Sequence, residues 1–284
     1  MRAKRLYHFY KHPAKGAEMK VTVLVENTAC GPHVKGQHGL SLYIENHGLK
    51  ILFDCGASGL FLENAQKLGV DIAAADYLII SHGHYDHGGG LETFLKVNDK
   101  AKIIASKHAF NDYYFKVALI NKYIGLDQAL KDNQRIIFVD QSLALGDGMI
   151  VFSDITGGKC RSAETTLLKK ENEKFMPDDF RHEQCLIIDN VLFAGCSHTG
   201  IVNIYEKAKG IREIGHIFGG FHLYNPATKK TEDKTLIENI AGEFKNENVK
   251  IYTGHCTGEN AFKILRSVLG DKIEEISTGI SYNF

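Results

Sequence analysis

The sequence lacks the features by which secreted, membrane-spanning and nucleic-acid-binding chains are usually identified. Its cysteines, at positions 30, 55, 160, 185, 196 and 256, include no Cys-x-x-Cys pair and have no regular spacing, so they predict no disulfide framework. No apolar run approaches the roughly 20 residues needed to cross a bilayer. The 34 basic and 34 acidic residues cancel, so the net charge favours neither nucleic acid nor an anionic membrane.

These absences set the expectations for location and partners. Residues 1–18 are basic and aromatic but contain no apolar core, so they do not form a secretory signal, and we expect a loose N-terminal extension there. The cysteines fit a reducing cytoplasm. We therefore expect a cytoplasmic protein without nucleic-acid or membrane partners, and a homo-oligomer is compatible with these features. A length of 284 residues allows one large α/β domain or two smaller ones.

The densest chemical signal is the segment SHGHYDH at residues 81–87. A predicted strand at 77–80 precedes it, and three glycines lead from it into a predicted helix that begins at Leu91. His82 and His84 can reach one ion if the glycine between them lets the backbone turn tightly, and Asp86 and His87 can then point at a second position. Imidazole and carboxylate ligands suit zinc, manganese or ferrous iron. A His-rich surface loop is the alternative, but so dense a ligand set favours a metal site.

The rest of the chain changes from hairpins to strand–helix units once in each half. Strands are predicted at 21–26, 40–45, 49–53, 102–105, 136–139, 149–152, 185–188, 191–194, 215–218, 249–253 and 273–277, and helices at 58–68, 107–133, 201–209, 233–246 and 259–269. The irregular segment 153–181 is interpreted as an insertion or lid loop, because so long a connection is more often functional than merely linking.

Glycine-flanked polar residues follow five of these predicted strands, at Asp54, His82, His198, His222 and His255. In layered α/β proteins the loops at one edge of a sheet gather such residues into a crevice. Each one alone is more simply a structural residue. Five strand ends with the same pattern, around one dense ligand loop, predict a shared site.

This combination of motifs resembles the metallo-β-lactamase-fold superfamily over nearly the whole chain from Met19. The resemblance implies an α/β fold, a four-layered αβ/βα sandwich of two mixed sheets flanked by helices, with residues 19–284 as one domain and an insertion or lid around 107–181. It implies two divalent metal ions, zinc foremost, with manganese, iron or magnesium as alternatives. The implied ligands are His82, His84 and His198 for the first ion, and Asp86, His87 and His255 for the second. Asp54 would brace the ligand loop from behind.

One position departs from the superfamily pattern. Many members with two metals have a bridging aspartate at a strand end, whereas the comparable segment here reads Phe-Ala-Gly-Cys-Ser-His, ending at His198. Either His198 is the third histidine and no carboxylate bridges, or Cys196 is a thiolate ligand in that place; buried cysteines more often only pack, which favours His198. His182 is the rival third histidine. Its charged neighbours Arg181 and Glu183 predict a solvated or substrate-facing turn instead.

A narrower resemblance rests on the segments VTVLVEN, HGLS, SHGHYDHGGGL, GCSHTGIVN, GGFHL and GHCTG. Together they resemble the dihydropterin-6-methyl-(ribofuranosyl)aminobenzene 5′-phosphate synthase-like branch. That branch implies metal-dependent transfer of a pterinyl-methyl group from its diphosphate to an aryl amine. The expected function is therefore a dinuclear-metal hydrolase or pterinyl-methyl transferase acting on a small phosphorylated substrate. The alternative is a metal- or ligand-binding protein with a vestigial site, which the missing aspartate supports.

Further residues are assigned to substrate and catalysis. Asp86 and His222 are the catalytic candidates; His222 faces substrate as a proton donor or phosphate contact, or else only closes its strand end. Lys159 and Arg161 could hold a phosphate by charge and exposed backbone N–H groups, although a solvated turn is the simpler interpretation. His38, in the glycine-rich loop 27–39, is the third substrate-binding candidate. A diiron oxygen reductase is disfavoured by the histidine at position 84, and a nuclease by the net charge of zero.

Overall fold

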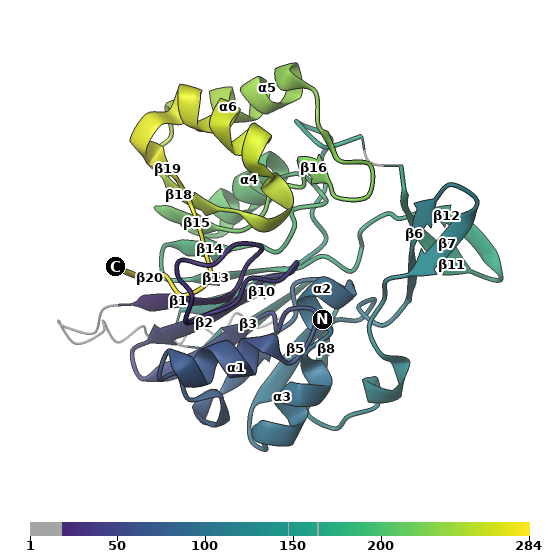
Figure 1. The fold of residues 1–284 in the computed structure, drawn as a ribbon, viewed down its shortest axis with the longest axis vertical. Coiled ribbons are helices and arrows are strands. Elements are labelled where there is room, and N and C mark those ends of the chain that lie inside the picture. Colours follow the sequence, from purple (N-terminus) through teal and green to yellow (C-terminus); the bar gives the residue numbers. More distant parts are fainter. Residues whose placement is uncertain (1–18, 147, 164) are drawn as a thin grey trace, which may run out of the picture.

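Two seven-stranded sheets face each other, with helices on both outer sides (Figure 1). This computed structural model describes residues 19–146, 148–163 and 165–284; the expected extension at 1–18 lies outside them. The predicted α/β class and four-layered αβ/βα sandwich are confirmed.

The first sheet has the strand order β20 (Ser281–Asn283), β1 (Lys20–Val25), β2 (Ser41–Asn46), β3 (Leu49–Phe53), β4 (Tyr77–Ile79), β5 (Lys102–Ser106) and β8 (Ile136–Val139). Its pairs are antiparallel from β20 to β3 and parallel from β3 to β8. Helices α1 (Leu60–Lys67) and α3 (Leu91–Val97) cover its outer face, and the one-turn helix α2 (Tyr85–Gly88) lies at its end.

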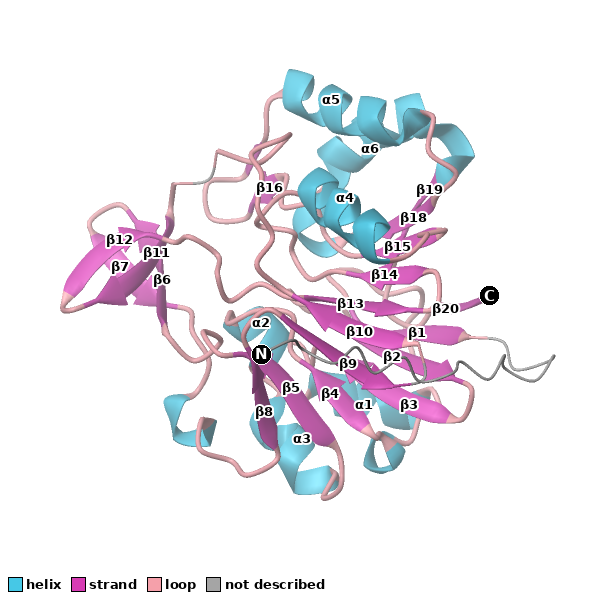
Figure 2. Cartoon of the chain, turned by 180° about the vertical axis from the view of Figure 1, so that it is seen from behind, coloured by secondary structure: helices cyan, strands magenta, loops and turns pink. Residues whose placement is uncertain are grey.

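The second sheet repeats this plan. Its order is β19 (Ile273–Glu275), β18 (Lys250–Thr253), β15 (His216–Phe218), β14 (Val191–Phe193), β13 (Cys185–Ile188), β10 (Met149–Phe152) and β9 (Ser142–Gly146). The pairs from β9 to β14 are antiparallel and those from β14 to β19 are parallel. Helices α4 (Ile201–Ile211), α5 (Lys234–Lys245) and α6 (Glu259–Leu269) cover it (Figure 2). The predicted change from hairpins to strand–helix units is confirmed in both halves.

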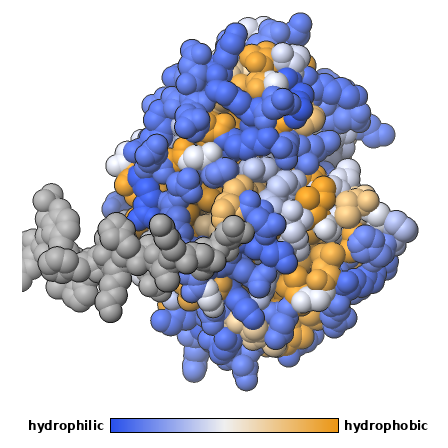
Figure 3. Space-filling view, turned by 90° about the vertical axis from the view of Figure 1, so that its left-hand side faces the viewer, coloured by the Kyte–Doolittle hydropathy of each residue, from blue (hydrophilic) through white to orange (hydrophobic). Residues whose placement is uncertain are grey.

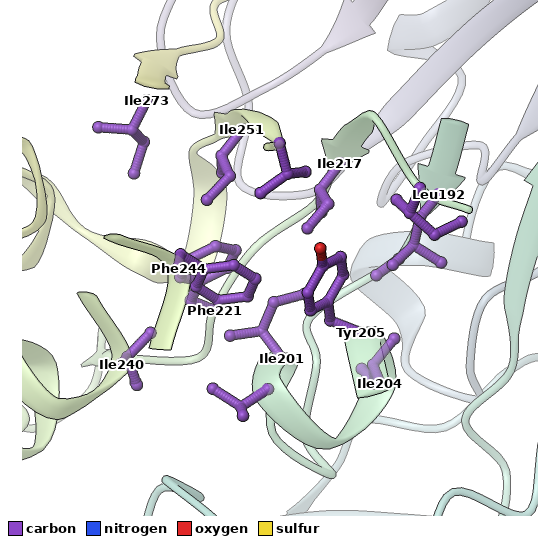
Figure 4. Close-up of a cluster of buried hydrophobic side chains, with 14 of the residues drawn as sticks. Leu192, Ile201, Ile204, Tyr205, Ile217, Phe221, Ile240, Phe244, Ile251 and Ile273 are labelled. Atoms are coloured by element: carbon purple, nitrogen blue, oxygen red, sulfur yellow. The ribbon is translucent and has the colours of Figure 1, made fainter. Parts of the chain in front are cut away.

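Three buried apolar clusters fill the spaces between the four layers. One lies between the sheets, where Phe53 of the first sheet contacts Phe193 of the second, with ring centroids 5.9 Å apart. A second fills the space under α1 and α3. The third, drawn in Figure 4, joins the second sheet to its helices and brings Ile217 and Ile251 against Tyr205 and Phe244. Both sheets are thus fixed on two faces, which makes their strand ends rigid supports.

A third sheet projects from one end of the sandwich, at the right of Figure 1. Its order is β12 (Lys174–Pro177), β11 (Leu167–Glu171), β6 (Asp112–Val117) and β7 (Ile120–Tyr123), all antiparallel. The prediction that 107–133 is helical is wrong; only Gln128–Leu130 forms a single 3₁₀ turn. The aromatic and β-branched residues of 112–123 favour strands, and they outweigh the Ala, Leu and Lys content on which the helix prediction rested.

Two smaller features complete the fold. The short pair β16 (Tyr224–Asn225) and β17 (Lys230–Thr231) lies between β15 and α5, and 3₁₀ turns occupy Ile72–Ala74, His255–Thr257 and Gly270–Lys272. Among the described residues, no helix is both long and apolar enough to cross a membrane. The face drawn in Figure 3 is largely hydrophilic, and its apolar areas are broken up by polar side chains.

Candidate functional site

Among the non-glycine residues with left-handed backbones, four follow strands that lead to the predicted site: Asp54 after β3, Ser197 after β14, His222 after β15 and His255 after β18, with φ between 50° and 58°. This conformation is uncommon outside glycine and tends to persist where the surroundings enforce it, often at functional sites. The chain therefore turns sharply after these strands, and the side chains of Asp54 and His255 meet His87 of the ligand loop.

Three histidines form what we call the imidazole group: His82, His84 and His198. The Nε2 atoms of His82 and His198 are 3.3 Å apart, and the His84 ring lies 4.7 Å and 5.0 Å from those of His82 and His198. All three side chains are buried. Burial, together with the neighbouring imidazoles, lowers the pKa of each ring, so all three are neutral at neutral pH.

Asp86, His87 and His255 form the carboxylate group. His87 Nε2 lies 3.2 Å from His255 Nε2, and the Asp86 Oδ2 atom is 3.3 Å from His255 Nε2 and 3.8 Å from His87 Nε2. Burial opposes charge here, yet Asp54 and Asp86 raise the pKa of His87. Burial likewise opposes ionisation of Asp86, but His87 and His255 hold the pKa of that carboxyl well below its usual range.

Cys196 lies where the two groups meet. Its Sγ atom is 3.1 Å from His87 Nε2. One ligand atom from each member of Asp86, His87, Cys196 and His255 lies within 4.8 Å of the others, and the same holds for His82, Cys196 and His198. The sequence left a choice between Cys196 and His198 at this position. The structure brings both side chains to the cluster.

His182 is not positioned as a rival ligand, and the predicted solvated turn is wrong. His182 and Glu183 are both buried. His182 Nδ1 accepts a hydrogen bond from Gly83 N–H at 2.9 Å, and its Nε2 lies 3.0 Å from Asp178 Oδ2. Both ring nitrogens are thus used within the protein. The Glu183 carboxylate accepts the backbone N–H groups of His198 and Thr199, at 2.6 Å and 2.9 Å, and so fixes that loop.

Asp54 braces the ligand loop from behind. Its carboxylate accepts the Ser81 N–H and the Ser81 hydroxyl, each at 2.7 Å, and its Oδ2 lies 2.7 Å from His87 Nδ1. The Ser81 hydroxyl oxygen is also 2.8 Å from His82 Nδ1. These contacts occupy the Nδ1 atoms of His82 and His87, so the Nε2 atoms of both rings face the cluster.

The N-terminal strand orients His255. Glu26 and Asn27 follow β1; the Glu26 carboxylate accepts the His255 N–H at 2.7 Å, and Asn27 Oδ1 lies 3.1 Å from His255 Nδ1. His255 Nε2 is therefore the atom presented to Asp86 and His87. Beside these residues lies a cavity of about 340 Å³ whose lining includes Tyr224, Glu259 and Glu275.

The predicted substrate residues have different surroundings. His38 Nε2 lies 3.3 Å from Asp86 Oδ2, and 42% of its side chain is exposed, so it flanks the carboxylate group. The Arg161 guanidinium lies 5.1 Å from the centre of the Phe180 ring, which stacks on His198 at 4.6 Å. Lys159 does not face the cluster, which corrects its assignment to phosphate: its ammonium lies 2.6 Å from Glu243 and 3.4 Å from Glu206.

His222 is half-buried, and its ring centroid lies 4.3 Å from that of His198. Its backbone N–H donates to Cys256 Sγ at 3.3 Å. This places the ring at the border of the imidazole group without making it part of that group.

Two glycines allow close packing at the site: Gly195 lies against Ser81 of the first half of the chain, and Gly83 lies against the segment that follows β5. A Cβ atom at Gly195 would lie 2.2 Å from Ser81 Oγ, and one at Gly83 would lie 2.3 Å from the Ala109 carbonyl oxygen. The backbone bends at His82 and Gly83, as expected, although the φ of Gly83 is not positive; close packing is a second reason for a glycine there.

Residues that hold the ligand-bearing loops were not predicted from the sequence, among them Glu26, Ser81 and Glu183. Ser81 and Glu183 each stand beside a histidine in the chain, which is the one signal that could have marked them. Glu26 contacts His255 across 229 residues of chain, so spacing alone could not identify it.

Comparison with known proteins extends these observations. The family model for the metallo-beta-lactamase superfamily matches residues 34–159. The chain is 32% identical over 247 residues to the uncharacterized protein MJ0448 of Methanocaldococcus jannaschii, covering 85% of this chain and 91% of that protein. It is 28% identical over 265 residues to the 7,8-dihydropterin-6-methyl-4-(beta-D-ribofuranosyl)-aminobenzene-5′-phosphate synthase of the same organism, covering 86% and 88%.

A solved structure is similar as well. The crystal structure of Tm1679, described as a metal-dependent hydrolase of the beta-lactamase superfamily, matches with a TM-score of 0.77 at 29% identity, covering 93% of this chain and 98% of that one. Both resemblances drawn from the sequence motifs, to the superfamily and to the synthase-like branch, are confirmed.

Proposed function

Because this chain belongs to the metallo-β-lactamase superfamily, we propose that it is an enzyme that uses two adjacent metal ions to act on a small phosphorylated substrate. One observation carries the proposal: the imidazole group and the carboxylate group are buried side by side and meet at Cys196. Imidazole nitrogens this close together in a buried place fit a shared cation well, because the Nε2 atoms of His82 and His198, 3.3 Å apart, can otherwise only share one proton.

The residues fit divalent metals of the zinc type. His82, His84 and His198 would hold the first ion, and Asp86, His87 and His255 the second. Neutral imidazoles, a carboxylate and a thiol are the donors that zinc prefers, and manganese or iron would accept the nitrogen and oxygen donors. Burial raises the pKa of the Cys196 thiol, so this side chain is neutral until a cation takes the place of its proton.

Two ions at such a site supply Lewis acidity and lower the pKa of water, which helps both the attacking and the leaving oxygen of a displacement. The protein's own residues hold the geometry. Asp54 and Ser81 fix His87 and His82, and Asp86 carries the negative charge between His87 and His255. We assign Asp86 a catalytic role in this sense: its carboxylate would help to hold the second ion beside the substrate.

The substrate class is inferred from the flanks of the site. Arg161 has no carboxylate within ion-pair distance among the described residues, and its guanidinium rests on the ring that stacks against His198. An arginine in this position suits a phosphate, which it can bind through two parallel hydrogen bonds. His38 lies beside Asp86, and His222 lies beside His198. We assign His38 to substrate contact and His222 to proton donation.

Two reactions fit the same site. The name of the synthase relative indicates formation of a dihydropterin-methyl-aminobenzene phosphate, whereas Tm1679 is described as a metal-dependent hydrolase. In a transfer, an amine would displace diphosphate from a pterinyl-methyl carbon; in a hydrolysis, water would be the nucleophile. The side chains of the site do not require one nucleophile over the other.

The test uses zinc-loaded protein purified without chelator. It is incubated with a pterinyl-methyl diphosphate plus an aryl amine, and separately with a phosphodiester, and products are identified by mass. Turnover in either assay that is lost in His84→Ala supports the proposal. Unchanged turnover in that variant, or less than one ion per chain with no turnover in the native protein, contradicts it; the latter would favour a binding protein with a vestigial site.

A further inference from the structure

The third sheet is joined to the ligand loop through a buried pair, Asp178 and His182. Asp178 follows β12, its side chain is fully buried, and its own N–H donates to the Leu167 carbonyl of β11 at 3.0 Å. Its Oδ1 atom accepts the Phe180 N–H at 2.8 Å, which leaves Oδ2 facing His182 and His84. A buried carboxylate in this position needs donors on both oxygens.

The contacts of His182 fix its tautomer. Its Nδ1 accepts from Gly83 N–H, a bond that only an unprotonated nitrogen can form. In the neutral ring the proton must then be on Nε2, which donates to Asp178 Oδ2 at 3.0 Å. His182 therefore connects the backbone of the ligand loop to Asp178, and neither of its nitrogens has a lone pair left for a metal.

His84 presents one nitrogen to the same carboxylate. Its Nε2 atom is buried, lies 3.7 Å from Asp178 Oδ2, and forms no hydrogen bond with the described residues. An imidazole that binds a metal through one nitrogen carries its proton on the other, and a carboxylate next to that proton orients the ring. With Nε2 toward Asp178, Nδ1 is the nitrogen left for a metal.

We propose that Asp178 is a positioning residue of the metal centre, which holds His84 as the Nε2–H tautomer and so directs Nδ1 to the first ion. Through Asp178 the third sheet becomes part of the site, because β11 and β12 fix the carboxylate that orients the ligand. This inference rests on the proposed metal-dependent function.

The direct test reads the tautomers in the metal-free protein. Long-range ¹H–¹⁵N spectra of protein labelled at histidine distinguish protonation at Nδ1 from protonation at Nε2. We expect His84 and His182 to be protonated at Nε2, and Asp178→Asn to convert His84 to a mixture of both tautomers. Protonation of His84 at Nδ1 in the native protein would overturn the proposal.

A second test measures Zn²⁺ affinity by competition with a chromogenic chelator. Asp178→Asn should weaken binding of the first ion by about 10–100-fold, the range usual for partners behind a metal ligand. The matched control is Asp179→Asn, whose carboxylate pairs with Lys169 at 2.7 Å and should leave the affinity unchanged. A role in folding alone would lower the stability of Asp178→Asn but change neither the affinity nor the His84 tautomer, and that result also overturns the proposal.

The outcomes separate this inference from the proposed function. Native protein that takes up no Zn²⁺ contradicts the metal-dependent function. Native protein that binds two ions while Asp178→Asn binds them equally well contradicts only the role of Asp178. If the variant does not fold, the tautomer of His84 in the native protein still decides the matter.

Discussion

The imidazole group and the carboxylate group differ in how they hold protons before any metal arrives. Burial keeps His82, His84 and His198 neutral, so their lone pairs are free. In the carboxylate group, Asp54 and Asp86 favour a proton on His87 against the effect of burial. The first group can thus bind a cation near neutral pH without releasing a proton, whereas the second must release one wherever the pH lies below the raised pKa of His87. One cluster can therefore contain two metal sites that differ in whether a proton must leave before the ion binds.

The largest expected effect comes from removing a ligand on either side. His84→Ala and Asp86→Ala should each lower the metal content from two ions to one and reduce turnover by more than about 100-fold, beyond the loss usual for an outer partner. Metal analysis and initial rates measure both. If both variants kept two ions, the division into two groups would be wrong.

Substitutions of Cys196 test whether its thiol contributes to metal binding where the imidazole group and the carboxylate group meet. Cys196→Ser should reduce turnover by about 10–100-fold and loosen one ion, whereas Cys196→Asp should retain both, because a carboxylate can also contact two ions. The control is Cys185→Ala, a buried cysteine of the core that packs against α4 and belongs to neither ligand group. Equal metal content in Cys196→Ser and the native protein would assign Cys196 to packing alone.

The pH dependence of metal binding should differ between the groups. Because the pKa of His87 is raised, binding to the carboxylate group must displace a proton, so its affinity should fall about tenfold per pH unit below that pKa. The imidazole group has lowered pKa values and should bind equally well at pH values near neutrality. The measurement is a series of Zn²⁺ titrations between about pH 5.5 and 8 at constant ionic strength. As the pH falls, the protein should lose the ion of the carboxylate group before that of the imidazole group. Loss of both ions at the same pH would contradict the expected difference in proton release between the two groups.

The smallest effect on turnover is expected at the predicted substrate-binding residues beside the metal ligands. Arg161→Ala should raise KM for a phosphorylated substrate about tenfold, or about 1.4 kcal/mol, with little change in kcat. Lys159→Ala is the matched control, because its ammonium is already paired with Glu243 and Glu206 on the surface. Steady-state kinetics of the two variants decide the assignment; a larger effect in Lys159→Ala would reverse it.

The sequence predicted the sandwich because its strands are apolar, short and regularly followed by helices. It also predicted the ligand loop, where four candidate ligands stand within six residues. The third sheet was missed, since a run rich in tyrosine, lysine and alanine has no decisive period. The residues that contact the ligands from behind were harder to predict. Asp178 lies beside His84 only because it follows β12 of the third sheet, and Glu26 contacts His255 across 229 residues of chain.

The central claim is that the two groups hold two ions that meet at Cys196. Crystals of the protein prepared with Zn²⁺ and without chelator should give two anomalous peaks at the zinc edge, about 3.5–4 Å apart. We expect one peak among His82, His84 and His198, another among Asp86, His87 and His255, and the Cys196 Sγ atom between them. A single peak, or two peaks that Cys196 does not touch, would contradict it.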